Sequence, residues 1–282
     1  MIRSIRLPIR QLRLPTAGLA ATGSRSFASA AARRESCACG SNTHLTYPDF
    51  KLPLNTTTPL STTGPSLWRH IILATGPKTQ DTWPHNPNKD PDSIAGVLEK
   101  MQKERPDARE KPIMIGLATL PKSTVEGMER LWVFPEGVCV DVSSADVESG
   151  RIDVWRHLLK PSEELEEMFG PEEGEEGGVI LICGHTARDP RCALAGPILL
   201  SQFLSPTSPS SQLPPNWKVA LTTHVGGHAY AGNVIVYSRH PKRGVWYGRV
   251  TPCDVEEIVG RTVRGGEVVE RLLRGVVEVE AG

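Results

Sequence analysis

The chain has 282 residues, which is enough for one large domain or two small ones. It contains 32 basic and 32 acidic residues, so its overall charge favours neither nucleic-acid binding nor attachment to a membrane surface. No apolar run approaches the roughly 18 residues that a membrane-spanning helix needs. We therefore expect a soluble mature protein with no membrane insertion. Six unevenly spaced cysteines favour metal or redox chemistry over a disulfide framework.

Positive charge is concentrated at the N-terminus. Residues 1–34 contain seven arginines and no acidic residue, interspersed with isoleucine, leucine, alanine and serine. This composition is typical of a mitochondrial presequence, which forms a basic amphipathic helix that the membrane potential pulls inward. Arg25 to Ser29 also resembles a matrix-peptidase cleavage site. We predict a presequence over residues 1–27 and a mitochondrial location, with the matrix favoured over the intermembrane space. The alternative is a disordered basic tail.

An irregular lead-in is expected over residues 28–66. This segment is rich in threonine, proline and serine, contains Cys37 and Cys39, and has little helical or strand periodicity. A first α/β unit is then predicted over residues 67–160. Its expected elements are a strand at 68–75, a helix at 94–104 begun by Asp92 and Ser93, a strand at 112–119, a hairpin of 131–134 with 138–142, and a short helix.

An acidic stretch over residues 161–178 separates this unit from the rest of the chain. Eight of its eighteen residues are glutamates, interrupted by prolines and glycines. We expect a short helix followed by a solvated linker. The alternative is a specific acidic docking site.

The order of elements is repeated over residues 179–282. Residues 137–148 also resemble residues 244–256, with one residue inserted. These observations predict two tandem thioredoxin-like units, of which only the second has candidate ligands. The expected elements of the second unit are a strand at 179–183, a helix at 193–204, a strand at 217–223, a hairpin at 233–250 and a helix at 252–260.

Two cysteines mark one side of a candidate site. Cys183 ends a predicted strand and Cys192 begins a predicted helix, with Gly184 and Pro190 indicating a loop between them. Basic residues in that loop and the exposed amides of the helix favour thiolate over thiol. The alternatives are two buried structural cysteines or a disulfide. Beside the pair, His185 could support the site, and Arg188, Asp189 and Arg191 could orient the loop or tune the metal centre.

Two histidines follow the next predicted strand. His224 and His228 enclose Gly226 and Gly227, and two glycines disfavour a helix at this position. In a loop, the glycines allow a tight turn that directs both rings toward one metal centre. Ordinary surface or core histidines are the alternative.

Two cysteines with two histidines suit more than one metal centre. They form a common tetrahedral zinc set, and they also match a Rieske-type [2Fe-2S] cluster. The eight residues between Cys183 and Cys192 exceed a usual zinc knuckle, which favours the larger centre. Neutral imidazoles in place of two thiolates would ease the addition of an electron. Because imidazoles can take up protons, the potential would also depend on pH.

Three segments carry a family resemblance: C-G-H through D-P-R-C, H-V-G-G-H, and the ending G-V-W-Y-G-R-V-T-P-C-D-V-E-E-I-V. Over roughly residues 36–276 the chain resembles the sucrase/ferredoxin-like family. Its ending also resembles thioredoxin-like [2Fe-2S] ferredoxins, which have a second cysteine pair where this chain has histidines. The resemblance implies an α/β fold with a C-terminal thioredoxin-like ferredoxin domain after a degenerate thioredoxin-like unit. It also implies a [2Fe-2S] cluster with the ligands Cys183, Cys192, His224 and His228.

The expected function is mitochondrial electron transfer, with a possible part in thiol redox homeostasis. We expect a non-enzymatic carrier with unidentified redox protein partners, no catalytic residue and no nucleic-acid ligand. In the family resemblance, Cys37 and Cys39 match a cysteine-rich opening and could form an auxiliary redox pair, with simple exposed thiols as the alternative. Two other functions remain open: a thiol oxidoreductase using Cys37/Cys39 or Cys183/Cys192, and a zinc-stabilised interaction module.

Overall fold

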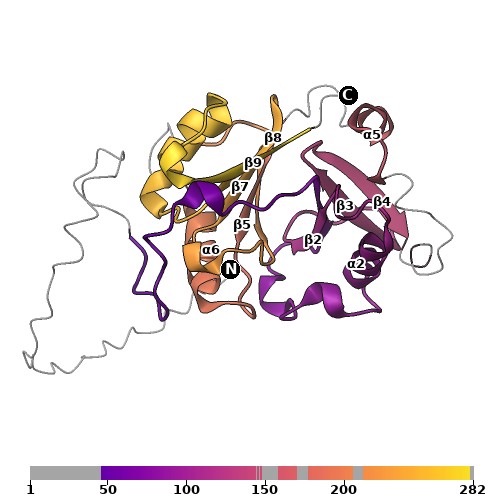
Figure 1. Cartoon of the computed structure of the whole chain (residues 1–282), viewed down its shortest axis with the longest axis horizontal. Helices are drawn as coiled ribbons and strands as arrows, with labels where there is room; N and C mark the ends of the chain where they lie inside the picture. The colour runs from indigo at the N-terminus through magenta and orange to yellow at the C-terminus, as the bar shows by residue number, and fades with distance from the viewer. Residues whose placement is uncertain are drawn as a thin grey trace, which may run out of the picture. The chain divides into compact units, whose positions relative to one another are not determined.

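The computed structural model describes residues 46–143, 145, 147, 158–169, 177–205 and 212–279. These residues belong to one compact unit. Their strands form a nine-stranded sheet in the order β4-β3-β1-β2-β6-β5-β7-β8-β9 (Figure 1). In this part of the chain, no helix is both long and apolar enough to cross a membrane. The predicted presequence, Cys37 and Cys39 lie outside the described residues and remain predictions.

The first half of the sheet has the predicted order of elements. Helix α2 begins where predicted, because the Ser93 side chain accepts a hydrogen bond from the Gly96 amide at 3.0 Å and caps the first turn. Strand β1 pairs in parallel with β2 and antiparallel with β3, which forms a hairpin with β4. The helix predicted after β4 lies largely outside the described residues. The observed elements are β1 (Arg69–Ala74), α2 (Ile94–Glu104), β2 (Ile113–Ala118), β3 (Met128–Phe134) and β4 (Val138–Ser143).

The second half repeats this topology. Strand β5 pairs in parallel with β6 and antiparallel with β7, and β7 forms a hairpin with β8. In each half the first strand therefore lies between its parallel partner and the hairpin, which is the thioredoxin-like arrangement. The elements are β5 (Val179–Cys183), α6 (Pro190–Leu204), β6 (Lys218–Thr222), β7 (Val234–Arg239) and β8 (Lys242–Tyr247).

The two halves meet along one edge and across a shared core. Strands β2 and β6 pair antiparallel through Ala118 and Thr222. Away from that edge, the ring of Phe134 on β3 stacks on Tyr237 of β7, with 4.1 Å between centroids. His70 of β1 is buried and its Nδ1 lies 2.9 Å from the Tyr237 hydroxyl, while burial lowers its pKa to about 3. The apolar cluster that contains Phe134 and Tyr237 thus includes side chains from both halves.

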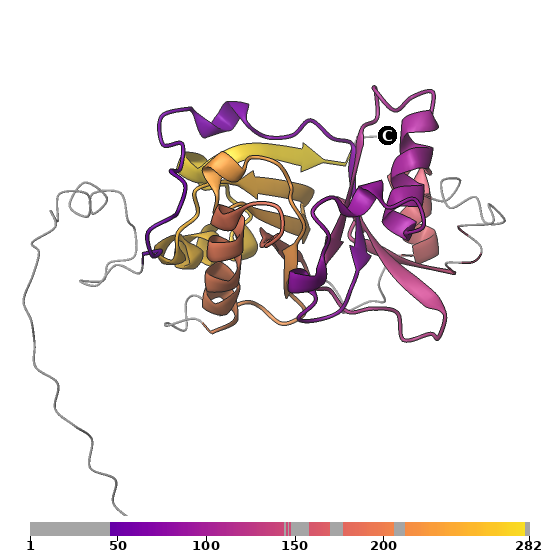
Figure 2. The ribbon, with the colours of Figure 1, turned by 90° about the horizontal axis from the view of Figure 1, so that it is seen from below.

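The C-terminal region differs from the sequence-based prediction. The expected helix over 252–260 is a 3-10 turn (Pro252–Asp254), a short α7 (Val255–Glu257) and a π-helix (Ile258–Arg264). A ninth strand, β9 (Leu273–Glu278), was not predicted and pairs antiparallel with β8. Figure 2 shows β9 in yellow, with the segment that precedes β1 running beside it. Further 3-10 turns are Leu60–Thr62, Gln80–Thr82, Pro87–Lys89, His228–Tyr230 and Glu270–Leu272.

The acidic stretch begins with the predicted helix. Helix α5 (Ser162–Phe169) buries Leu165, and Glu166 pairs with Lys242 of β8. Residues 170–176 lie outside the described part of the chain. The proposed domain boundaries at 161 and 178 therefore remain predictions.

Candidate metal centre

The two cysteine thiols come from the end of one strand and the start of one helix. Cys183 is the last residue of β5, which is buried along its whole length, and Cys192 lies in the first turn of α6. The helix begins at Pro190, three residues earlier than predicted, because the Asp189 carboxylate accepts the Arg191 amide at 2.9 Å and caps it. Assigning Pro190 to a loop was therefore wrong. Both thiols are only 1% exposed.

A glycine on α6 allows the two thiols to approach. A Cβ at position 196 would lie 2.5 Å from Gly184 Cα and 2.9 Å from the Cys183 carbonyl oxygen. Only glycine therefore lets α6 pack directly against the chain that leaves β5. The close approach brings Cys192 to Cys183, and both are free thiols.

The histidines lie in a glycine-containing turn after β6. His224 is half-buried, and its Nδ1 lies 3.9 Å from Cys183 Sγ. Gly226 and Gly227 have φ values of +79° and +71°. These angles do not occur in an α-helix, so this segment forms a loop, as predicted. His228 is exposed, and its Nδ1 lies 3.4 Å from His224 Nε2.

The structure brings three of the four predicted ligands into one group. One ligand atom each from Cys183, Cys192 and His224 lies within 4.8 Å of the others, and no second group of this kind occurs among the described residues. His228 is outside this group but directly beside His224. The donor atoms therefore form an elongated set, buried at the cysteine end and open at the histidine end.

The protonation of the cysteines suits metal binding. A hydrogen bond from Cys192 holds the pKa of Cys183 well below its ordinary value, with further help from His224 and the Val225 amide against the opposing effect of burial. The same hydrogen bond, together with burial, raises the pKa of Cys192. One proton is thus shared between a thiolate and a thiol, and a bound metal would replace it.

His185 supports the site without being available as a ligand. Its Nε2 lies 3.0 Å from the Pro84 carbonyl oxygen, and its Nδ1 lies 3.2 Å from the His224 amide nitrogen. A carbonyl can only accept, so Nε2 carries the proton and Nδ1 accepts from the amide. Both ring nitrogens are therefore used, and burial lowers the pKa of the ring. His185 fixes the backbone of His224, and no local sequence pattern indicates Pro84 as its partner.

The charged residues of the cysteine loop have separate roles. Arg191 donates from Nε and Nη2 to the two carboxylate oxygens of Asp189, each at 2.9 Å. This pairing lowers the pKa of Asp189 and fixes the start of α6. Arg188 instead points outward, and its Nη1 lies 2.9 Å from Asn86 Oδ1 and 3.2 Å from His85 Nδ1.

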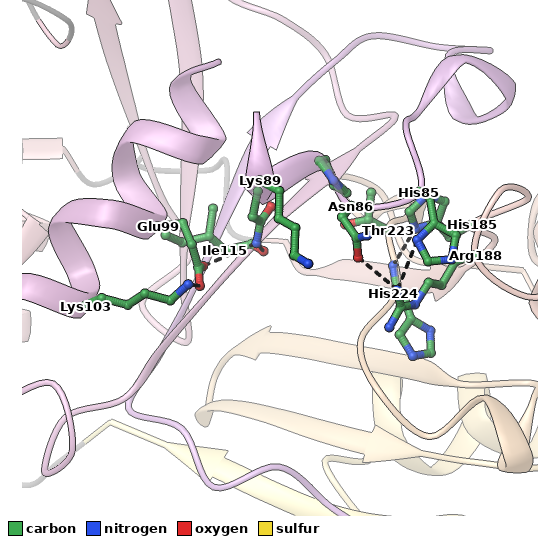
Figure 3. Close-up of a pocket in the computed structure, with 12 residues that line it drawn as sticks. His85, Asn86, Lys89, Glu99, Lys103, Ile115, His185, Arg188, Thr223 and His224 are labelled. Carbon is green, nitrogen blue, oxygen red and sulfur yellow. Dashed lines mark hydrogen bonds and ion pairs between the residues drawn. The ribbon is translucent and has the colours of Figure 1, made fainter. Parts of the chain in front are cut away.

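A cleft of about 220 Å³ adjoins His224 (Figure 3). It is lined by residues of both halves, and Figure 3 shows Lys89 reaching into it opposite Arg188. No carboxylate pairs with Arg188 or with Lys89 among the described residues. The cleft therefore places positive charge next to the exposed end of the candidate site.

The donor set fits a [2Fe-2S] cluster. Thiolate and imidazole are ligands of mixed iron–sulfur centres and of zinc alike. Here the sulfur donors lie at the rim of a buried core, whereas the imidazoles face outward. This is a suitable environment for a redox centre that must exclude solvent on one side and stay accessible on the other.

Arg274 is a site residue that the sequence did not indicate. It lies on the unpredicted strand β9, is 3% exposed, and donates from Nη1 to the Gly226 carbonyl at 3.3 Å and to Asn233 Oδ1 at 2.7 Å. A Cβ at position 227 would lie 2.5 Å from its Nη2. The second glycine of the histidine turn is thus required by this guanidinium as well as by its backbone angle.

Solved structures similar to the chain include the thioredoxin-like [2Fe-2S] ferredoxin from Aquifex aeolicus. The wild-type form is 27% identical and covers 36% of this chain and 98% of its own, with a TM-score of 0.30. A second structure of this ferredoxin is 29% identical, covering 38% and 99%, with a TM-score of 0.30.

Relatives with known names span most of the chain. The protein called "Altered inheritance of mitochondria protein 32" is 32% identical in Clavispora lusitaniae and 31% identical in Debaryomyces hansenii, in each case over 81% of this chain and 87% of the relative. "Actin patches distal protein 1" of Saccharomyces cerevisiae is 27% identical over 74% of this chain and 73% of its own. The model of the sucrase/ferredoxin-like family matches residues 60–275. The chain therefore belongs to the sucrase/ferredoxin-like family.

Proposed function

We propose that the protein is an electron carrier whose [2Fe-2S] cluster is held by Cys183, Cys192, His224 and His228. The observation that supports this most strongly is the convergence of two thiols and an imidazole within 4.8 Å, with the second imidazole adjoining. When bound, such a cluster supplies one-electron exchange, at a higher potential than an all-cysteine cluster would.

The residues of the chain divide the work between a buried and an exposed side. The cysteines are shielded from water, which protects the sulfur ligands from oxidation and exchange. His185 accepts a hydrogen bond from the His224 amide, which fixes the backbone from which the His224 ring extends. Imidazole ligands of a cluster can take up protons when it is reduced, so we expect electron uptake to be accompanied by proton uptake.

A zinc site is the first alternative, because the same donors suit that ion. A single tetrahedral ion requires all four donor atoms at comparable distances from one point. Here three donors cluster, and His228 lies beyond them on the far side of His224. This elongated set supports a centre with two metal ions over a single ion.

A thiol oxidoreductase is the second alternative, supported by the lowered pKa of Cys183. Attack on a disulfide of another protein requires an accessible sulfur. Cys183 and Cys192 are buried too deeply for that, so this function would depend on Cys37 and Cys39, which lie outside the described residues.

We also propose the side of approach for a redox protein partner. The exposed His228 and the positive cleft beside His224 suit a partner with acidic groups near its own redox centre. The arginine-rich N-terminus and the names of the Clavispora and Debaryomyces relatives support a mitochondrial location, with the matrix favoured.

Purification under anaerobic conditions tests this function. We expect a coloured protein with equal amounts of iron and acid-labile sulfide, about two of each per chain. Visible absorption, iron, zinc and sulfide should be measured on the same sample. A colourless protein that contains zinc and no sulfide would rule out the cluster.

A further inference from the structure

Arg274 is a buried cation whose hydrogen bonds all go to neutral groups. Besides Gly226 and Asn233, its Nε donates to Thr63 Oγ1 at 3.1 Å and its Nη2 donates to the Thr63 carbonyl at 2.6 Å. No carboxylate pairs with it among the described residues. Its polar atoms are therefore satisfied, but its charge is not neutralised.

Such an arrangement is costly unless an anion is nearby. Removing a charge from water costs several kcal/mol, and neutral hydrogen bonds repay only part of that cost. Arg69, the other fully buried arginine in the described part of the chain, pairs with the Glu136 carboxylate. Arg274 has no such partner, so its surroundings should contain another source of negative charge.

The candidate metal centre is that source. Arg274 bonds the carbonyl of Gly226, two residues after His224, and contacts Gly227. Burial lowers the pKa of Arg274, and Tyr230, whose ring lies 5.7 Å from the guanidinium carbon, opposes this lowering together with Cys183 and Cys192. When a metal holds them as thiolates, the two sulfurs are anionic groups that act on this guanidinium.

We infer that Arg274 is the counter-charge of the metal centre and the positioning residue of its histidine turn. This inference rests on the proposed function. A fixed positive charge favours the reduced, more negative cluster and therefore raises its potential. The guanidinium also connects Thr63, Gly226 and Asn233 to strand β9. These hydrogen bonds fix the position of the turn that carries His224 and His228.

Replacement of Arg274 separates charge from position. In Arg274→Gln we expect the midpoint potential to shift to more negative values and the electron paramagnetic resonance spectrum of the reduced protein to change. Arg274→Lys keeps the charge but cannot make all four hydrogen bonds, so its spectrum should change with a smaller shift in potential. Arg271→Gln is the matched control, because Arg271 lies three residues away and pairs with Asp254; it should match the wild type.

Unfolding of the cluster-loaded and metal-free forms gives a second readout. Because the cluster would supply the missing negative charge, Arg274→Gln should destabilise the loaded protein more than the metal-free protein. A purely structural role would lower the melting temperature of both forms equally. If Arg274→Gln does not fold, the same comparison is made with Arg274→Lys. This variant should lose stability about equally in the loaded and metal-free forms, because the charge is retained. Its altered spectrum would report the displaced histidine turn.

The outcomes distinguish the inference from the proposed function. A wild-type protein that never holds iron and sulfide would overturn the function itself. A wild-type protein that holds the cluster, together with unchanged potential and spectrum in Arg274→Gln, would overturn only the role of Arg274. An unchanged spectrum in Arg274→Lys would contradict the positioning role alone.

Discussion

The two halves of the sheet have one topology but differ where the candidate ligands lie. Ala74 pairs with Ala118 in the first half as Cys183 pairs with Thr222 in the second. The third residue of the helix that follows is a glycine in α2 and a cysteine in α6, and the second residue after the next strand is a leucine or a histidine. The positions of Cys183, Cys192 and His224 thus correspond to Ala74, Gly96 and Leu120.

This difference indicates that the fold does not require a metal centre. In the first half, small and apolar residues fill the equivalent positions, and Ala74 and Leu120 are buried. The buried arginine of that half pairs with a carboxylate, whereas Arg274 of the second half has neutral partners only. The equivalent positions are therefore filled by packed side chains in the first half and, in our proposal, hold a charged cluster in the second.

Replacement of the candidate cysteine ligands should have the largest effect, which is a loss of bound iron. Cys183→Ser and Cys192→Ser should each lose most of the bound iron, because a serine hydroxyl is a far weaker ligand than a thiolate. Cys139→Ser is the control from the first half, since Cys139 lies on β4 with no candidate ligand group around it in the described chain. Iron per chain is the measurement. Full iron content in either ligand variant would contradict the assignment.

Replacement of the two histidines tests whether their rings are ligands of the cluster. His224→Cys and His228→Cys should each keep iron but lower the midpoint potential by about 100 mV or more, because a thiolate adds negative charge to the cluster. The dependence of the potential on pH should also weaken, since one protonatable ring is lost. His85→Gln, in the neighbouring cleft, is the control. An unchanged potential in both variants would mean that the rings are not ligands.

The contact between the halves should respond to pH through His70. The folded protein keeps this ring neutral down to a pKa of about 3, whereas the unfolded chain takes up a proton near its ordinary value of 6.5. Stability from this group is therefore present above pH 6.5 and decreases as the pH falls toward 3, by up to about 1.4 kcal/mol per pH unit.

Urea unfolding at pH 7 and pH 5 measures this effect. His70→Gln should lose less stability between the two values than the wild type, by about 2 kcal/mol. His240→Gln is the control, because His240 is exposed. An identical loss in the wild type and in His70→Gln would show that the buried ring does not contribute.

The smallest effect concerns the cleft between the halves. Lys89→Glu and Arg188→Glu should each slow oxidation of the reduced cluster by ferricyanide about two- to five-fold at low salt, and accelerate oxidation by a cationic cobalt complex. Lys100→Glu, on an exposed part of α2 away from the cleft, should change neither rate. Equal changes with both oxidants would exclude an electrostatic role for the cleft.

Local pattern was sufficient to predict the frame of the site. The apolar runs that form β5 and β6 and the glycine pair after His224 specify a strand, a strand and a turn without reference to distant residues. The first residue of α6 was misplaced, because the proline at position 190 suggests a loop unless the cap at Asp189 is recognised. Helix periodicity alone does not locate that cap.

Distant contacts explain what the sequence did not reveal. Arg274 bonds Thr63, which lies 211 residues earlier, and the tautomer of His185 depends on Pro84, which lies 101 residues earlier. Strand β9 (L-R-G-V-V-E) has an arginine and a glycine in its first half and follows a 3-10 turn, so no continuous apolar run marks it. β9 forms a strand because it pairs with β8. Arg274 has its role because it contacts the histidine turn.

The ligation of the cluster by two imidazoles is tested most directly by pulsed electron paramagnetic resonance of the dithionite-reduced protein. The account predicts a reduced [2Fe-2S] signal with strong coupling to nitrogen, which diminishes in His224→Cys and in His228→Cys and is lost when both are replaced. A signal without nitrogen coupling in the wild type, or coupling that survives both replacements, would contradict it.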